Sequence, residues 1–107
     1  MNNILFICSK NQWRSPTAES LFRKNPNLSV RSAGTSSSAR RQGTLNDIQW
    51  ADIILVMEDK HKSRLKVEFR RHLEYIPLHV LDIPDDYPFM DPQLIEILEQ
   101  TVPTYLP

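Results

Sequence analysis

Two residues near the start of the chain have the side chains needed for covalent phosphoryl transfer. Cys8 supplies a thiol, which becomes a nucleophile when it ionises. Arg14, six positions later, supplies a planar guanidinium that can hold two oxygens of a phosphate at once. Ser15 adds a hydroxyl directly after the arginine. This spacing predicts a site where Cys8 attacks phosphorus while Arg14 stabilises the charge on the phosphoryl oxygens.

The elements around this pair would position it at an anion site. Ile4 to Ile7 form an uninterrupted apolar run, which predicts a strand buried on both faces, with Cys8 at its carboxyl end. Ser15 and Pro16 predict a helix start, with Ser15 as the cap and Pro16 at the first helical position. The loop from Cys8 to Arg14 would therefore present backbone N–H groups and a helix N-terminus, which favour an anion and favour thiolate over thiol.

A lone pair with this spacing is weak evidence, because a cysteine at a strand end is more often a small buried apolar residue. The surrounding sequence changes that balance. The chain resembles the low-molecular-weight protein tyrosine phosphatases, as a short, divergent member. Their signature is a cysteine, five residues with asparagine third, then arginine, serine and proline, and the matching residues are Cys8, Asn11, Arg14, Ser15, Pro16, Ala18 and Glu19. The resemblance continues in order through RSAGT at 31–35, ADIILVM at 51–57 and IPDDY at 83–87.

The resemblance implies a general acid as well as a nucleophile. The family uses the aspartate of an Asp-Pro-Tyr sequence, and Asp85 occupies that position, with Tyr87 as the aromatic that lines the pocket. Asp86 stands in place of the proline, so it is an alternative acid. The remaining residues expected to bind phosphate or shape the loop are Ser9, Lys10, Asn11, Gln12, Trp13 and Ser15. Ser32 is expected either to brace Asn11 or to be a plain strand residue.

The chain departs from the family pattern at several positions. Lys10 replaces a glycine and would add positive charge at the pocket mouth. Trp13 replaces a second cysteine that could protect Cys8 as a disulfide, so Cys8 is expected to be open to over-oxidation. Pro88 replaces a second aromatic. The segment 36–50 is shorter than usual, so an element beside the site is expected to be missing.

The rest of the chain alternates predicted strands with predicted helices. Strands are expected at 28–33, as an edge strand, at 53–57, as a central strand, and at 75–80; helices are expected at 44–50 and 59–73 and after a cap at Asp91. Strand–helix alternation implies right-handed parallel units with the ligand at the carboxyl ends of the strands. The family fold agrees: a three-layer flavodoxin-like α/β fold, with a four-stranded parallel sheet flanked by helices.

Composition limits the classes of partner. The 107 residues are expected to form one domain, 1–107, and 13 basic and 13 acidic residues give no net charge that would favour nucleic acid or an anionic membrane. One cysteine fits a reducing compartment, so a cytoplasmic location is expected. The segment from Gly34 to Gly43 is expected to be a flexible loop, with Arg40 and Arg41 either solvated or in contact with an anionic partner.

No cofactor or metal is expected, because phosphocysteine chemistry needs neither and the three histidines, His61, His72 and His79, show no metal-binding spacing. The predicted activity is that of a cysteine-dependent phosphomonoesterase, acting on a phosphorylated protein, with phosphotyrosine favoured, or on a small aryl phosphate. Two alternatives remain: an arsenate reductase that borrows an external thiol, and a non-catalytic module that binds phosphate or phosphopeptides. The chain is expected to be a monomer or a weak homodimer.

Overall fold

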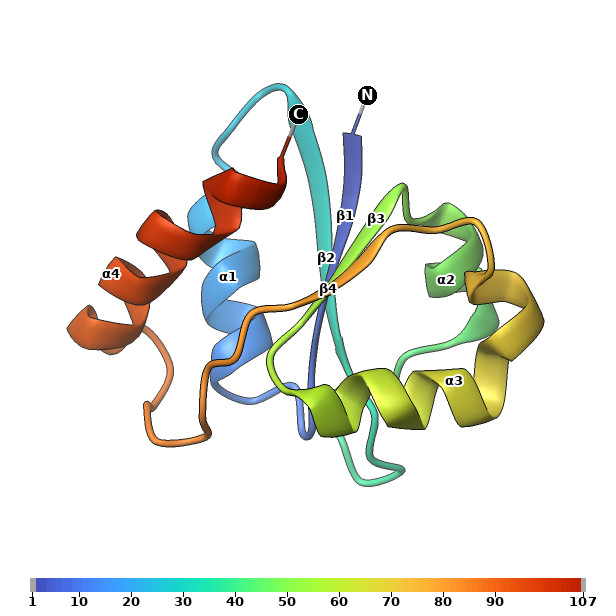
Figure 1. Cartoon of the computed structure of the whole chain (residues 1–107). Helices are drawn as coiled ribbons and strands as arrows, with labels where there is room; N and C mark the ends of the chain where they lie inside the picture. The colour runs from blue at the N-terminus through green and yellow to red at the C-terminus, as the bar shows by residue number, and fades with distance from the viewer. Residues whose placement is uncertain (1, 107) are drawn as a thin grey trace.

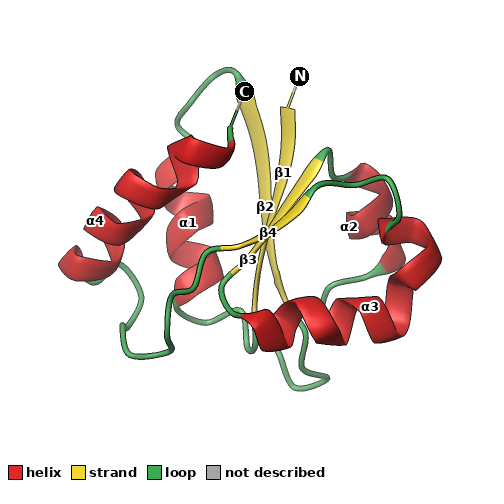
Figure 2. Ribbon diagram, in the orientation of Figure 1, coloured by secondary structure: helices red, strands yellow, loops and turns green. Residues whose placement is uncertain are grey.

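The computed structural model describes residues 2–106, in which strands and helices alternate along the chain (Figure 2). Met1 and Pro107 lie outside the described residues. The elements, in order, are β1 (Asn2–Cys8), α1 (Arg14–Phe22), β2 (Leu28–Gly34), α2 (Leu45–Trp50), β3 (Ile53–Val56), α3 (Asp59–Leu73), β4 (Leu78–Val80), α4 (Pro92–Thr101) and a short 3₁₀ helix, η1 (Val102–Tyr105).

The four strands form one parallel sheet in the order β2-β1-β3-β4. The predictions that β2 is an edge strand and that β3 lies inside the sheet are both confirmed. The register pairs Cys8 with Gly34 and Ile7 with Val56. The carboxyl ends of β1, β2 and β3 therefore meet at one edge of the sheet.

Helices cover both faces of the sheet, which gives the three-layer α/β architecture expected from the sequence. Figure 1 shows α1 and α4 on one side of the sheet and α2 and α3 on the other. Along β1, Ile4, Phe6 and Cys8 belong to the core on the α1 side, while Leu5 and Ile7 belong to the core on the α3 side. All five are buried, which explains why the sequence of this strand shows no polar alternation.

One of the two predicted helix caps is present and the other is not. The predicted cap Asp91 accepts hydrogen bonds from the backbone of Gln93 and Leu94 at the start of α4. Thr44, which was not predicted as a cap, caps α2. The predicted Ser15 cap is wrong, because α1 begins at Arg14 and its N-cap residue is Trp13, which makes no capping hydrogen bond through its side chain. The hydroxyl of Ser15 is instead used inside the active-site loop, as described below.

Two other expectations need correction. The fourth strand begins at Leu78, not at Tyr75, because 74–77 form the turn that leaves α3 and Tyr75 is 89% exposed. The segment between Gly34 and Gly43 is not a free loop, since its backbone is hydrogen-bonded to β2 and to the loop after β1. Helix α3 has the predicted bounds, with a non-helical backbone at Phe69.

None of the helices in residues 2–106 has the length and apolar character needed to cross a bilayer.

Leu98 of α4 is fully buried in the core on the α1 side, so we expect Leu98→Ala to destabilise the fold. Loss of the buried side chain and the cavity left behind should lower the free energy of unfolding by about 2–5 kcal/mol. Urea denaturation followed by circular dichroism measures it. The control is Val67→Ala, at a position that is 82% exposed and should change the stability by less than about 0.5 kcal/mol. Equal effects of the two substitutions would contradict the assigned core.

Candidate active site

The loop after β1 is held by its carbonyl groups. The carbonyls of Cys8, Ser9 and Lys10 accept hydrogen bonds from the backbone N–H groups of Thr35, Ser36 and Arg40, at 3.0, 3.0 and 2.9 Å. The side chain of Arg40 adds a fourth tie, from Nε to the carbonyl of Asn11, at 3.0 Å. The segment 35–40 therefore binds the carbonyl side of this loop.

The N–H groups of the same loop are free. Within residues 2–106, the backbone N–H groups of residues 10–14 donate to no hydrogen bond. Asn11 lies at a φ of 55°, in the left-handed region that asparagine tolerates better than most residues. A run of N–H groups without hydrogen-bond partners at the start of a helix has the chemistry needed to bind an anion such as phosphate.

Gly34 lets the two segments approach each other closely. A Cβ at this position would lie 2.5 Å from the carbonyl oxygen of Ser9 and 2.6 Å from the Cβ of Ala39. Both distances are shorter than van der Waals contact allows. The end of β2 therefore needs a glycine, because the active-site loop lies directly against its backbone.

A buried chain of hydrogen bonds leads from Glu19 to the cysteine. Ser32 Oγ donates to Glu19 Oε1 at 2.6 Å, and Asn11 Nδ2 donates to both Ser32 Oγ and Ser15 Oγ at 2.9 Å. Ser15 Oγ lies 3.0 Å from Cys8 Sγ. Because Ser15 Oγ already accepts a hydrogen bond from Asn11 Nδ2, the hydroxyl of Ser15 can donate its own hydrogen bond to a thiolate on Cys8. The contact expected between Ser32 and Asn11 is present.

Arg14 is 1% exposed, and its guanidinium is only partly used by the protein. Its Nη1 donates to the carbonyl oxygen of Ile83 at 2.7 Å and to the carboxylate of Glu58 in a short ion pair. Its Nε is buried and has no hydrogen-bond partner among residues 2–106. Asp85 Oδ1 lies 3.5 Å from this Nε, without the geometry of a hydrogen bond. Arg14 therefore keeps a donor for a bound anion.

These groups surround a small pocket of about 90 Å³. Its lining residues are Cys8, Lys10, Gln12, Trp13, Arg14 and Asp85. The volume is enough for a phosphoryl group and leaves the rest of a larger substrate outside. Lys10 is held at the mouth by Ser36 Oγ at 3.4 Å and by Ser38 Oγ.

The predicted acid and the predicted aromatic lie in different environments. Asp85 lines the pocket and is 53% exposed, whereas Asp86 is exposed and is not one of the pocket's lining residues. Tyr87 is half-buried against the core on the α1 side and does not line the pocket either. The aromatic wall is supplied by Trp13, which is 43% exposed.

Glu58 and His61 are part of the site, although the sequence analysis did not assign them to it. Burial alone raises the pKa of Glu58, but the hydrogen bond and charge of Arg14 outweigh burial and hold that pKa below its usual value. Burial, followed by the positive charge of Arg14, lowers the pKa of His61 to about 4. His61 is therefore neutral near pH 7.

The hydrogen bonds of His61 fix its tautomer. Its Nδ1 accepts from the backbone N–H of Glu58 at 3.0 Å, so the single proton of the neutral ring lies on Nε2. Nε2 then donates to Ser9 Oγ at 2.8 Å. His61 thus braces the active-site loop from the α3 side. His72 is exposed, and His79 stacks on Tyr105 with ring centroids 4.5 Å apart.

Arg40 and Arg41 are neither merely solvated nor placed as a pair on the pocket. Arg40 holds the loop at Asn11, as described above. Arg41 donates to the carbonyl of Ser32 at 2.7 Å and to Asp47 at 2.5 Å. Burial alone would raise the pKa of Asp47, but hydrogen bonds from Arg41 and Thr44 lower it below its usual value. Both arginines therefore hold the segment that supports the active-site loop.

One positional signal could have identified Glu58. It lies two residues after the end of β3, at the same edge of the sheet as Cys8, and the rule that predicted Asp85 at this edge applies equally to it. His61 gives no such signal, because it lies within a helix. Among residues 2–106, no group of three or more histidine, cysteine, aspartate or glutamate side chains is placed to hold a metal ion.

Known proteins share the sequence of this site. Residues 3–46, which include the strand, the loop and α1, match the family model described as "Low molecular weight phosphotyrosine protein phosphatase". A protein-arginine-phosphatase from Bacillus subtilis (strain 168) is 30% identical in an alignment of 101 positions, and the match covers 69% of this chain and 67% of the relative.

Solved structures share the fold. A low-molecular-weight protein tyrosine phosphatase from Streptococcus pyogenes superposes with a TM-score of 0.80 at 19% identity, covering 99% of this chain and 91% of the other. The tyrosine phosphatase Wzb from Escherichia coli K30, in complex with phosphate, gives 0.78 at 23% identity, covering 97% and 95%. An arginine phosphatase from Geobacillus stearothermophilus gives 0.73 at 21% identity, covering 98% and 93%.

The neutral state of His61 makes a pH-dependent contribution to stability. In the unfolded chain a histidine gains a proton near pH 6.5, whereas in the fold His61 does so only near pH 4. Between these values the unfolded state binds more protons, so stability falls as the pH falls. We expect a loss of about 2 kcal/mol between pH 7 and pH 5, measured by urea denaturation.

His61→Gln should lower the free energy of unfolding at pH 7, because hydrogen bonds are lost. It should also make the free energy of unfolding depend less on pH between pH 7 and pH 5, because the titrating group is gone. His72→Gln, at an exposed histidine, is the matched control and should keep the wild-type slope. If His61→Gln keeps the wild-type slope too, protonation of another group must cause the pH dependence of stability.

Proposed function

The chain belongs to the low-molecular-weight phosphotyrosine protein phosphatase family and is a hydrolase of that family, and we propose that it removes phosphate from phosphotyrosine in proteins through a phosphocysteine on Cys8. The observation that carries this proposal is the set of unused donors around the thiol. The N–H groups of residues 10–14 and the Nε of Arg14 have no hydrogen-bond partner within residues 2–106. A phosphate dianion is the ligand that would satisfy them together.

In the first step the sulfur of Cys8 attacks phosphorus, and the bond between phosphorus and the ester oxygen breaks. The hydroxyl of Ser15 stabilises the thiolate before attack. Arg14 and the loop N–H groups hold the three equatorial oxygens as charge moves onto them. Asp85, in its protonated form, gives its proton to the leaving oxygen, so that a neutral phenol departs.

In the second step water attacks the phosphocysteine. Asp85, now a carboxylate, accepts a proton from that water while the phosphorus–sulfur bond breaks. The thiolate of Cys8 is regenerated and inorganic phosphate leaves. Support for Asp85 in both steps comes from its position: it lines the pocket with Cys8, whereas Asp86 does not.

Two features of the pocket mouth favour an aryl substrate. The indole of Trp13 offers a face on which a tyrosine ring can stack. Lys10 adds positive charge, which opposes the positively charged guanidinium of a phosphoarginine. Phosphoarginine is nevertheless the second candidate, because the Bacillus subtilis relative is a protein-arginine-phosphatase and shares 30% identity.

Substitutions at the nucleophile and at the two aspartates test the mechanism. With phenyl phosphate as substrate and chelator present, we expect Cys8→Ser to lower kcat by at least about a thousandfold. Asp85→Asn should lower kcat on the order of a hundredfold, and the matched variant Asp86→Asn should lower it far less. Full turnover by Cys8→Ser would exclude the covalent mechanism.

The leaving group gives a second readout for the acid. The phenol released from phenyl phosphate has a pKa of about 10 and needs a proton donor. The more acidic phenol of para-nitrophenyl phosphate can leave without one. The loss caused by Asp85→Asn should therefore be much smaller with para-nitrophenyl phosphate. If the loss is the same for both substrates, Asp85 does not act as the acid.

Phosphoamino acid specificity is measured by kcat/KM for peptides that differ only in the phosphorylated residue. We expect kcat/KM for the phosphotyrosine peptide to be about tenfold or more above that for the phosphoarginine peptide. Stacking of the tyrosine ring on Trp13 and repulsion of the guanidinium by Lys10 are together large enough for this difference. Trp13→Ala should reduce this preference. A higher kcat/KM for phosphoarginine would assign the chain the activity of its Bacillus subtilis relative.

A further inference from the structure

A groove leaves the active-site pocket and follows one face of α1. Its volume is about 440 Å³, and it shares Gln12 with the pocket. The residues that matter here are Gln12, Pro16, Glu19, Arg23, Arg40 and Phe89. Pro16, Glu19 and Arg23 are spaced by three and four positions, so they lie on the same face of the helix. The groove therefore leads away from the phosphate site along the surface of the molecule.

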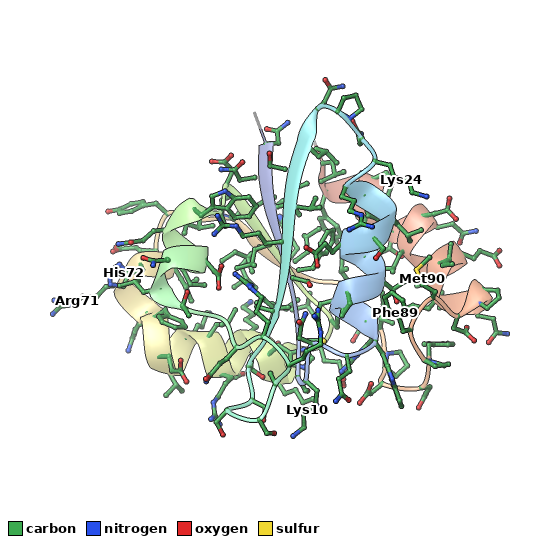
Figure 3. The ribbon with its side chains drawn as sticks, turned by 180° about the vertical axis from the view of Figure 1, so that it is seen from behind. Lys10, Lys24, Arg71, His72, Phe89 and Met90 are labelled. Atoms are coloured by element: carbon green, nitrogen blue, oxygen red, sulfur yellow. The ribbon has the colours of Figure 1, made fainter. Side chains whose placement is uncertain are left out.

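Apolar side chains are exposed along this route. Phe89 is 50% exposed, Met90 is 37% exposed, and Trp13, where the pocket meets the surface, is 43% exposed. These three are half of the large apolar side chains that are exposed on residues 2–106. Figure 3 shows Phe89 and Met90 beside α1. A cluster of exposed apolar residues next to a catalytic pocket is typical of a surface that binds another molecule.

The exposure of Phe89 is built into the fold. Met90 has a φ of 61°, which is unfavourable for a residue with a side chain. Its backbone N–H donates to Thr17 Oγ1 at 2.9 Å, and that hydroxyl donates to the carbonyl of Trp13 at 2.6 Å. Thr17 is fully buried. A buried hydrogen-bonded side chain thus holds the turn in a strained conformation and keeps Phe89 at the surface.

The groove also offers positive charge. Arg40 is fixed through its Nε to the loop carbonyl of Asn11, and it carries its charge at the groove. Arg23 is exposed and makes no ion pair within residues 2–106. The one carboxylate in the lining, Glu19, accepts a hydrogen bond from Ser32 and makes no ion pair with Arg23. The guanidinium of Arg23 is therefore available to an acidic side chain of a partner.

We propose that this groove binds the polypeptide segment that flanks the phosphorylated residue of a protein substrate, with an apolar side chain on Phe89 and an acidic side chain on Arg23. This inference rests on the proposed phosphatase function. The pocket holds the phosphoryl group, so the flanking chain must cross the surface that adjoins it. Arg23 lies about 14 Å along the helix axis from Arg14. An extended peptide covers that distance in about four residues, so the acidic residue lies about three to five positions from the phosphorylated one.

Phosphotyrosine peptides test the proposal. Each peptide carries a leucine next to the phosphotyrosine. It also carries one aspartate, about three, four or five positions from the phosphotyrosine, on the N-terminal or the C-terminal side. In a paired peptide, lysine replaces that aspartate. The quantity measured is kcat/KM for the peptide divided by kcat/KM for para-nitrophenyl phosphate. For one aspartate position, wild type should favour the aspartate peptide over the lysine peptide by about five- to tenfold.

Arg23→Glu should reverse this preference, because the pairing charge is then inverted, and Phe89→Ala should lower the ratio for every peptide that carries leucine. The control is Lys24→Glu, which makes the same charge change one residue away. Lys24 does not line the groove, and Figure 3 shows it at the far end of α1 from the pocket. Lys24→Glu should leave the preference as in wild type. If no aspartate position matters, or if Arg23→Glu and Lys24→Glu act alike, the groove does not bind the substrate chain.

A binding measurement separates this inference from the proposed function. The Cys8→Ser protein is titrated with the same fluorescein-labelled phosphopeptides and with inorganic phosphate, with and without Arg23→Glu or Phe89→Ala. Tighter binding of the aspartate peptide that is lost in Arg23→Glu supports the groove even if wild type hydrolyses nothing. Equal affinity for all peptides and no effect of either substitution overturns it, even if wild type is an active phosphatase.

Discussion

The active site depends on four hydrogen bonds that segment 35–40 makes to the carbonyl groups of the loop after β1. Because a trans peptide unit directs its C=O and N–H groups to opposite sides, tying the carbonyls on one side presents the N–H groups on the other. The shape of the candidate anion site thus depends on a neighbouring segment that does not line the pocket. Gly34 belongs to the same constraint, since only a residue without a Cβ lets the loop lie against the end of β2.

Charge is balanced around Arg14 without using all of its donors. A buried guanidinium requires a counter-charge, and Glu58 provides it through Nη1. His61 lies close to the same arginine and remains neutral, so it can brace Ser9 without adding positive charge. The site as folded therefore supplies a counter-charge for Arg14 and still has donors without a hydrogen-bond partner among residues 2–106. Without the counter-charge of Glu58, burying the guanidinium of Arg14 would destabilise the folded state.

The sequence predicted the fold, and it predicted that Cys8, Arg14 and Asp85 lie around one pocket, because both follow from local patterns and one topological rule. Parallel strands bring their carboxyl ends together, which places Cys8, Arg14 and Asp85 near one another once the strands are recognised. The predictions from sequence failed where contacts between distant segments determine the local structure. Ser15 has the pattern of a helix cap, but its one hydroxyl is used at Cys8, and no local signal distinguishes the two uses. Nothing in the sequence of 34–43 shows that this polar segment is bound to another loop.

The way the loop is held also couples ligand binding to folding. The N–H groups of residues 10–14 converge only after β2 has paired with β1 and brought segment 35–40 into place, so the unfolded chain has no comparable site. A ligand that binds the folded chain alone shifts the unfolding equilibrium toward the native state, by an amount that grows with the logarithm of its concentration. Phosphate is such a ligand under the proposed function, and the fraction of folded molecules should then rise with the concentration of the product that the enzyme releases.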